Sequence, residues 1–202
     1  MESGKKFVAN YAGLEGVADM RSPHVGGNMR AGDPYTYTPR AWEYLIDRFA
    51  VSSALDLGSG GGYAGMFLHK RGVRVVCVDG LAENISKALY PTIQHDLTTG
   101  AVETYVDLVH CQEVVEHVEE RYVENIIDTF LSGRIIVFTH ALPGQGGYHH
   151  VNLQPPAYWI NHMNAKGCVL LEADTARVRE LAKLDGGVYL HATGLVFENP
   201  KH

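Results

Sequence analysis

The sequence predicts an α/β fold in which helices pack on both faces of one doubly wound, mostly parallel sheet. From about Thr38 to Glu198, short apolar runs typical of buried strands alternate with amphipathic stretches. A burst of glycines joins the first such run to the next amphipathic stretch, which is a strand, loop and helix signature. With 202 residues and 46% hydrophobic content, the chain can bury one substantial core.

Residues 1–37 are expected to form an arm, and residues 38–202 the folded domain. Met1 to Asp33 shows little periodicity and much Gly, Asn and Arg, which predicts a loop-rich segment with one short helix. The arm is either a disordered tail or a lid over the site. A lid is slightly favoured by four of its side chains, Phe7, Tyr11, His24 and Arg30.

The domain begins with a predicted helix over Pro39–Phe49, whose apolar side chains recur at helical spacing. Thr38 is the expected N-cap and Pro39 the first helical residue. Trp42 is expected in the core. The central unit follows, with a strand ending at Asp56, a helix over Met66–Gly72 and a strand over Val73–Asp79.

The remaining elements continue the alternation. Strands are expected at Pro91–Gln94, Val106–Cys111, Ile135–Phe138, Gly167–Glu172 and Gly187–Phe197. Helices are expected at Ala82–Leu89, at Val118–Phe130, after the pair Pro155 and Pro156, and at Thr175–Leu184.

The glycine-rich turn predicts a nucleotide-binding site. Glycine allows the backbone to adopt positive φ and a ligand to approach closely, and the next helix offers free N–H groups. Residues 60–65 match the dinucleotide pattern GxGxxG, which makes a dehydrogenase the runner-up. In the register Asp56-Leu57-Gly58-Ser59-Gly60-Gly61-Gly62, however, an acidic residue precedes the glycines. That anion would repel a pyrophosphate but suits a ligand with an ammonium group.

This motif resembles the first motif of the class I S-adenosylmethionine-dependent methyltransferases, in particular the small bacterial and phage proteins of the type 11/12 group. The resemblance implies a Rossmann-like sheet of seven strands with an antiparallel last strand, and S-adenosylmethionine as cofactor. Asp79 would accept the ribose hydroxyls, and the resemblance assigns the adenine amino group to Asp96. The expected cofactor-binding residues are Asp56, Gly58, Ser59, Gly60, Gly62, Asp79, Gly80, Asp96, Leu97 and Gln112.

The sequence Glu113-Val-Val-Glu116-His117 after the fourth strand has two interpretations. It resembles the Glu-x-x-Glu-His of ubiquinone-pathway O-methyltransferases and small-RNA 2′-O-methyltransferases, where a cation binds the accepting hydroxyls. His149 or His150 would then be a fourth ligand. The same string also occurs without metal, with the glutamates capping or orienting and His117 acting as base or pocket wall. The interpretation without metal is favoured.

A glycine-rich and histidine-rich loop covers residues 141–154. The run Pro-Gly-Gln-Gly-Gly before His149 and His150 is similar to small methyltransferases found among surface-polysaccharide genes. A loop at the carboxyl end of a strand can close over substrate, so a site role is expected for one of the two histidines, with the choice left open. His110, His69 and His162 are expected to be structural.

Charge and composition narrow the choice of partners. The net charge is −6, and residues 101–128 hold eight acidic residues and one basic residue, Arg121. This composition predicts a small-molecule substrate and disfavours nucleic acid or an anionic membrane. Cys77, Cys111 and Cys168 show no paired spacing and are expected as buried thiols. No signal core or membrane-spanning run is present in the sequence, which predicts a soluble, cytoplasmic protein.

The predicted function is methyl transfer from S-adenosylmethionine to a small hydroxylated acceptor, a sugar or related metabolite, by direct displacement. His117 or His150 would accept the proton, with His149 as the alternative. Glu113 and Glu116 would orient the accepting histidine. One alternative is a metal-dependent O-methyltransferase acting on an RNA terminus or a catechol-like ring. Another is a non-catalytic subunit that binds S-adenosylmethionine.

Overall fold

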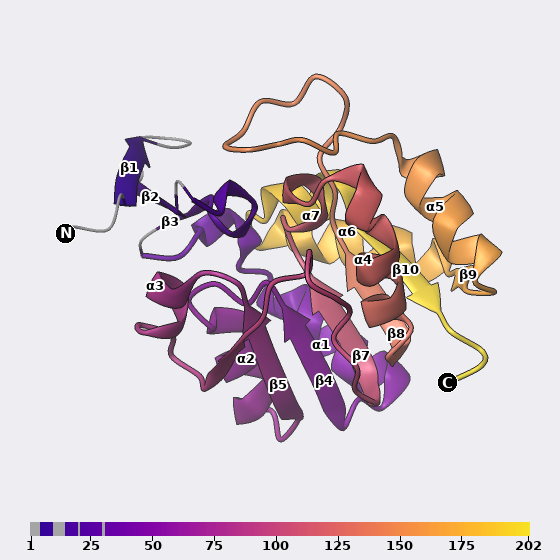
Figure 1. Ribbon diagram of the computed structural model, residues 1–202. Coiled ribbons are helices and arrows are strands. Elements are labelled where there is room, and N and C mark those ends of the chain that lie inside the picture. Colours follow the sequence, from indigo (N-terminus) through magenta and orange to yellow (C-terminus); the bar gives the residue numbers. More distant parts are fainter. Residues whose placement is uncertain (1–4, 10–14, 20, 30) are drawn as a thin grey trace.

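The computed structural model describes residues 5–9, 15–19, 21–29 and 31–202. A seven-stranded sheet with the order β6-β5-β4-β7-β8-β10-β9 forms its centre (Figure 1). The strands are β4 (Ser53–Leu57), β5 (Arg74–Asp79), β6 (Thr92–Gln94), β7 (Val106–Cys111), β8 (Gly133–Phe138), β9 (Val169–Leu170) and β10 (Leu195–Glu198). The pairs from β6 through β8 are parallel, and β10 is antiparallel to both β8 and β9. The predicted fold class is confirmed.

Helices cover both faces of the sheet. They are α1 (Pro39–Phe49), α2 (Tyr63–Lys70), α3 (Ala82–Ile85), α4 (Val123–Phe130), α5 (Pro156–Ala165), α6 (Glu172–Leu184) and α7 (Val188–Thr193). Neighbouring strand residues point to opposite faces, so Val109 joins the core under α4 and α5, whereas Leu108 joins the core under α1, α2, α6 and α7. Both faces are buried, as expected of a mostly parallel sheet.

Helix α1 begins and ends where the sequence predicts, and Trp42 is buried as expected. Thr38 is the N-cap residue, but its side chain makes no capping hydrogen bond, and its hydroxyl is buried without a partner among the described residues. Helix α1 therefore begins at Pro39 without that contribution. Among the described helices, none is both long enough and apolar enough to cross a bilayer.

The predicted final strand over Gly187–Phe197 was wrong in its first half. Residues Val188–Thr193 form α7, and only Leu195–Glu198 form β10. Leu190 and Thr193 are buried three residues apart, which is a helical spacing. In so short a segment, the alternation of Val188 and Leu190 also satisfied a strand pattern.

Other elements also differ from the prediction at their ends, among them α2, which covers Tyr63–Lys70 and not Met66–Gly72. The helix expected from Ala82 to Leu89 ends at Ile85, because the Leu89 N–H donates to the Gly61 carbonyl and Pro91 follows. The helix expected from Val118 begins as α4 at Val123, after a single 3₁₀ turn over Glu120–Tyr122. Near the end of the chain, β9 has only two residues, and α6 already begins at Glu172.

The N-terminal arm contains strands that were not predicted. β1 (Lys5–Ala9), β2 (Glu15–Asp19) and β3 (Asn28–Met29) pair antiparallel in a small separate sheet, followed by a 3₁₀ turn over Pro34–Thr36 (Figure 1). One short helix was expected within residues 1–33 at no stated position, and their described part contains a 3₁₀ turn over Pro23–Val25. Such short strands depend on backbone pairing and carry little hydrophobic periodicity. Tyr11, Arg30 and the side chain of Phe7, all cited for a lid, lie outside the described residues.

Candidate active site

A cavity of about 660 Å³ lies at the carboxyl ends of β4, β5 and β7. This is the edge of an α/β sheet at which ligands bind. The glycine loop after β4 forms its floor, residues of the N-terminal segment 24–37 form one side, and residues 145–148 and His150 form another. In Figure 1 both covering segments approach this edge of the sheet.

The glycine loop needs glycine at three alternating positions. Gly58, Gly60 and Gly62 have φ of 68°, 53° and 73°, in the region that favours glycine. A Cβ on Gly58 would overlap the side chain of Val114. The Ser59 hydroxyl is buried without a partner among the described residues, so it is available to a ligand.

Asp79, at the end of β5, holds the glycine loop in place. Its Oδ2 accepts from the Gly60 N–H at 2.8 Å, and its Oδ1 accepts from the Leu81 N–H at 2.8 Å and the Asn84 amide at 3.0 Å. Burial raises the pKa of this carboxyl, while the hydrogen bonds oppose the rise. Asp79 lines the cavity, and carboxylate oxygens have further lone pairs for ribose hydroxyls.

Asp56 lies at the end of β4, and both of its oxygens are engaged within the protein. Oδ1 lies 2.7 Å from His110 Nδ1, and Oδ2 accepts from the Gly65 N–H at 3.0 Å. Asp56 lines the cavity but is only 2% exposed. The attraction of a ligand ammonium to Asp56 stays a prediction.

Asp96, expected at the adenine, is paired with the N-terminal segment. His24 Nε2 lies 2.9 Å from its Oδ2, and Thr98 donates to its Oδ1 from both its N–H and its hydroxyl. Burial acts to raise the pKa of Asp96, but the hydrogen bonds from His24 and Thr98 outweigh it and lower the pKa. Leu97 and Gly80, also expected at the cofactor, line the same part of the cavity.

Glu113 follows β7 in a left-handed conformation, with φ of 54°. This strain is of the kind found at functional sites. Thr139 binds both the backbone and the side chain of Glu113. The Glu113 N–H donates to the Thr139 hydroxyl at 2.8 Å, and that hydroxyl donates to Glu113 Oε1 at 2.9 Å. Burial raises the pKa of Glu113 to about 7. Glu113 and Glu116 do not share one helical turn as expected, because only Val115–His117 form a 3₁₀ helix.

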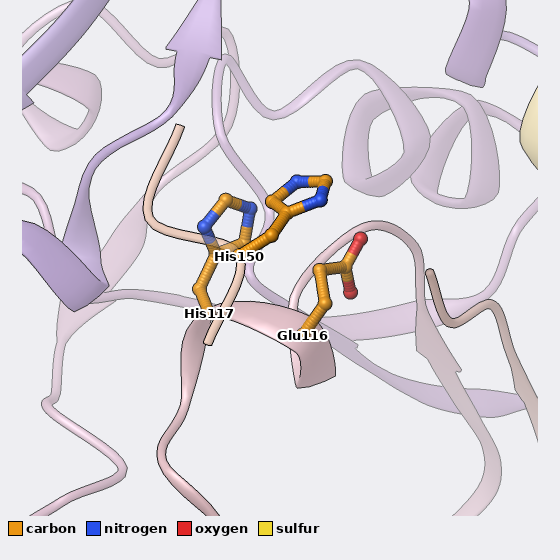
Figure 2. A group of neighbouring side chains, drawn as sticks. All are labelled: Glu116, His117 and His150. Atoms are coloured by element: carbon orange, nitrogen blue, oxygen red, sulfur yellow. The ribbon is translucent and has the colours of Figure 1, made fainter. Parts of the chain in front are cut away.

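Glu116, His117 and His150 meet at the edge of the cavity (Figure 2). One ligand atom from each lies within 4.8 Å of the others, and the two imidazole rings are 4.9 Å apart. Both oxygens of Glu116 are buried without a partner among the described residues, and burial together with Glu113 raises its pKa well above the ordinary value. The pKa of His117 is lowered to about 3, first by burial and then by the charges of the neighbouring His150 and His149. Its ring is therefore neutral.

The structure distinguishes the two loop histidines. His150 lines the cavity, whereas His149, at φ of 50°, does not. Glu113 lines the cavity but lies outside the group of three that could hold a metal. His117 and His150 are therefore the candidate metal ligands that also line the cavity.

Sequence reasoning missed several residues of the cavity. His110 was expected to be structural, but it lines the cavity beside Gln112. The signal was present, because residues 110 and 112 point to the same side of an extended chain. Asp33 and Tyr189 also line the cavity and are joined by a 3.0 Å hydrogen bond, which no local pattern reveals.

Residues 55–129 match the family model described as "Methyltransferase domain". The match indicates a methyltransferase domain in this part of the chain. A comparison with curated protein sequences finds no match. The match favours a methyltransferase over the dehydrogenase suggested by the glycine pattern.

Solved structures show the same methyltransferase fold. A SAM-dependent methyltransferase from Archaeoglobus fulgidus is 13% identical, with a TM-score of 0.57 over 84% of this chain and 96% of that chain. A TehB-like methyltransferase from Corynebacterium glutamicum is 21% identical, with a TM-score of 0.57 over 79% and 87%. The protein of a DhpI-SAH complex is 20% identical, with a TM-score of 0.53 over 80% and 84%.

The residues of the cavity fit S-adenosylmethionine. Its amino, ribose and adenine groups are hydrogen-bond donors, and the cavity presents carboxylates together with the unpartnered Ser59 Oγ and Gln112 Oε1. Gly58, Gly60 and Gly61 line the cavity without side chains, whereas Gly62 does not line it. The volume of about 660 Å³ is within the range of small-molecule sites.

Proposed function

We propose that this methyltransferase methylates a hydroxyl of a small, uncharged acceptor, a sugar or related metabolite, and that His117 or His150 accepts the proton. The main support for this proposal is the pair of imidazoles at the carboxyl end of β7, both of which line the cavity. A neutral imidazole has a free nitrogen lone pair for that proton. Glu113 and Glu116, next to His117, are proposed to orient the acceptor and the ring.

The reaction then needs little more than positioning. When bound, S-adenosylmethionine would supply a methyl group on a sulfonium, and the C–S electron pair would stay on sulfur as the methyl is transferred to the acceptor oxygen. The hydroxyl proton moves to a ring nitrogen of His117 or His150 and later to water. The cofactor is proposed to lie on the glycine loop, held by the residues expected from the sequence, with Asp79 at the ribose and Asp96 at the adenine.

The charge of the cavity supports an acceptor without phosphate. Its described lining includes six acidic residues and no Lys or Arg, the acidic ones being Asp33, Asp56, Asp79, Asp96, Glu113 and Asp185. A phosphorylated acceptor would meet repulsion in a site of low dielectric. This disfavours the RNA-terminus alternative, which would need a cation.

The N-terminal segment is proposed to be the lid of the site. His24 pairs with Asp96, the Tyr63 hydroxyl donates to the Ala31 carbonyl, and a Cβ on Gly27 would lie 2.8 Å from the His117 ring. Residues 1–37 would thus act on a domain formed by residues 38–202. The lid would exclude water from the transfer.

We expect His117→Ala and His150→Ala each to lower the turnover number by about 100-fold or more, because a positioned proton acceptor contributes on that scale. Affinity for S-adenosylmethionine, measured by titration calorimetry, should change little. His149→Ala is the matched control, since His149 neighbours His150 but does not line the cavity. Full activity of both His117→Ala and His150→Ala, in a screen that begins with sugars, would refute the proposal.

A metal-dependent O-methyltransferase is the second candidate. One carboxylate and two imidazoles within 4.8 Å, with both Glu116 oxygens unpartnered, form a ligand set for a divalent transition metal. This candidate predicts that a chelator abolishes turnover, that Mn²⁺ restores it, and that Mn²⁺ raises the melting temperature of the wild type but not of Glu116→Gln. Turnover that persists after exhaustive chelation would contradict the metal-dependent candidate and favour the metal-free reaction.

A further inference from the structure

Three buried side chains from three elements form a hydrogen-bonded chain beside the cavity. The Trp42 indole of α1 donates to His110 Nε2 at 3.1 Å, and His110 Nδ1 lies 2.7 Å from Asp56 Oδ1. The rings of Trp42 and His110 are nearly perpendicular, at 88°. Each of the three residues is at most 4% exposed, so the geometry is fixed by packing.

This series of hydrogen bonds determines which nitrogen of His110 carries the proton. An indole N–H can only donate, so His110 Nε2 must accept. The single ring proton of a neutral imidazole is then on Nδ1, from which it is donated to Asp56. The Gly65 N–H donates to the other Asp56 oxygen at 3.0 Å and fixes the carboxylate.

The protonation of His110 fixes the orientation of the Gln112 amide. Its Nε2 donates to His110 Nε2 at 2.9 Å and to the Thr36 carbonyl at 3.2 Å. Because both of these atoms only accept, the orientation of the amide is defined. Gln112 Oε1 is left buried without a hydrogen-bond partner among the described residues, in a side chain that lines the cavity. A buried acceptor without a donor is destabilising, and a donor on a bound ligand would relieve that cost.

We propose that Gln112 Oε1 binds the ammonium group of S-adenosylmethionine, and that Asp56, His110 and Trp42 are positioning residues that hold Gln112 in the orientation for this contact. The inference rests on the proposed placement of the cofactor. Asp79 and Asp96 follow β5 and β6, so a cofactor whose nucleoside lies there extends its amino-acid end past β4 toward β7. Gln112 directly follows β7.

The test compares two ligands that differ at this end, namely S-adenosylmethionine and 5′-methylthioadenosine, which lacks the amino-acid group. Calorimetric titration of Gln112→Leu should show about a tenfold or greater loss of affinity for S-adenosylmethionine, the scale of a hydrogen bond to a charged group. Affinity for 5′-methylthioadenosine should stay within about twofold of the wild type. His110→Phe should give the same selective loss, because the Gln112 amide is then free to turn over.

If His110→Phe does not fold, Trp42→Phe provides a second test of the proposal. It removes the donor to His110 Nε2 and should also weaken S-adenosylmethionine selectively. Trp159→Phe is the matched control, because Trp159 is fully buried on the other face of the sheet and its indole N–H has no partner among the described residues. Equal losses for both ligands, or no loss, would overturn the inference. A wild type that binds neither ligand would instead overturn the proposed placement of the cofactor.

Discussion

Replacing Gly58 with alanine will weaken binding of S-adenosylmethionine by about 100-fold or more. Gly58 has φ of 68°, where a side chain costs roughly 1–2 kcal/mol. A Cβ would also overlap Val114, which lies directly before the 3₁₀ turn that carries Glu116 and His117. Relief of the overlap must move either the cofactor loop or that turn. Calorimetry and thermal unfolding measure the two consequences.

Gly72→Ala separates this effect from backbone strain alone. Gly72 has φ of 84°, but a Cβ there would meet nothing within 4 Å. We expect it to lose about 1 kcal/mol of stability, which is roughly 2–4 °C in melting temperature for a chain of this size, with cofactor affinity unchanged. Gly58→Ala should lose about twice as much stability. If the two variants behave alike, or if Gly58→Ala binds the cofactor normally, the close approach of Val114 does not constrain the loop.

The glycine loop and the sheet were predictable because they depend on local rules. Positive φ at Gly58, Gly60 and Gly62 requires glycine, and parallel strands buried on both faces require continuous apolar runs. The strand at Val106–Cys111 was therefore predicted to its exact ends. The cluster at Glu113, Glu116 and His117 was found for the same reason, since it directly follows that strand.

The contacts that give these residues their properties could not be predicted. His110 reaches Asp56 across 54 residues, and His24 reaches Asp96 across 72 residues. The sequence shows that an acidic residue precedes the glycines, but not that its oxygens are taken up within the protein. The same limit applies to α7, where Tyr189 contacts Asp33 of the N-terminal segment and the helix replaces an expected strand.

Glu116→Gln should become more stable relative to the wild type as the pH rises from about 5 to 8. Burial raises the pKa of Glu113 to about 7 and that of Glu116 well above its ordinary value of 4.5, whereas both pKa values return to about 4.5 on unfolding. Between pH 4.5 and 7 the folded chain therefore holds more protons than the unfolded chain, and stability falls as the pH rises. The free energy of unfolding of Glu116→Gln relative to that of the wild type should therefore rise across this pH range.

The comparison with the wild type is essential because His117 acts in the opposite direction. Its pKa is lowered to about 3, so between pH 3 and 6.5 the unfolded chain holds more protons and stability rises with pH. That contribution is present in both proteins and largely cancels in their difference. Glu103→Gln, at an exposed glutamate, is the control and should show no relative change.

Denaturant unfolding at several pH values, with a chelator present, measures this difference directly. A pH-independent difference between Glu116→Gln and the wild type would mean that the buried carboxyls already have a counter-charge. In that case the folded protein keeps a cation at Glu116 that the chelator does not remove. A pH-dependent difference would instead show that the carboxyl pair holds its own proton beside the imidazoles of His117 and His150. The metal-free reaction requires this second state.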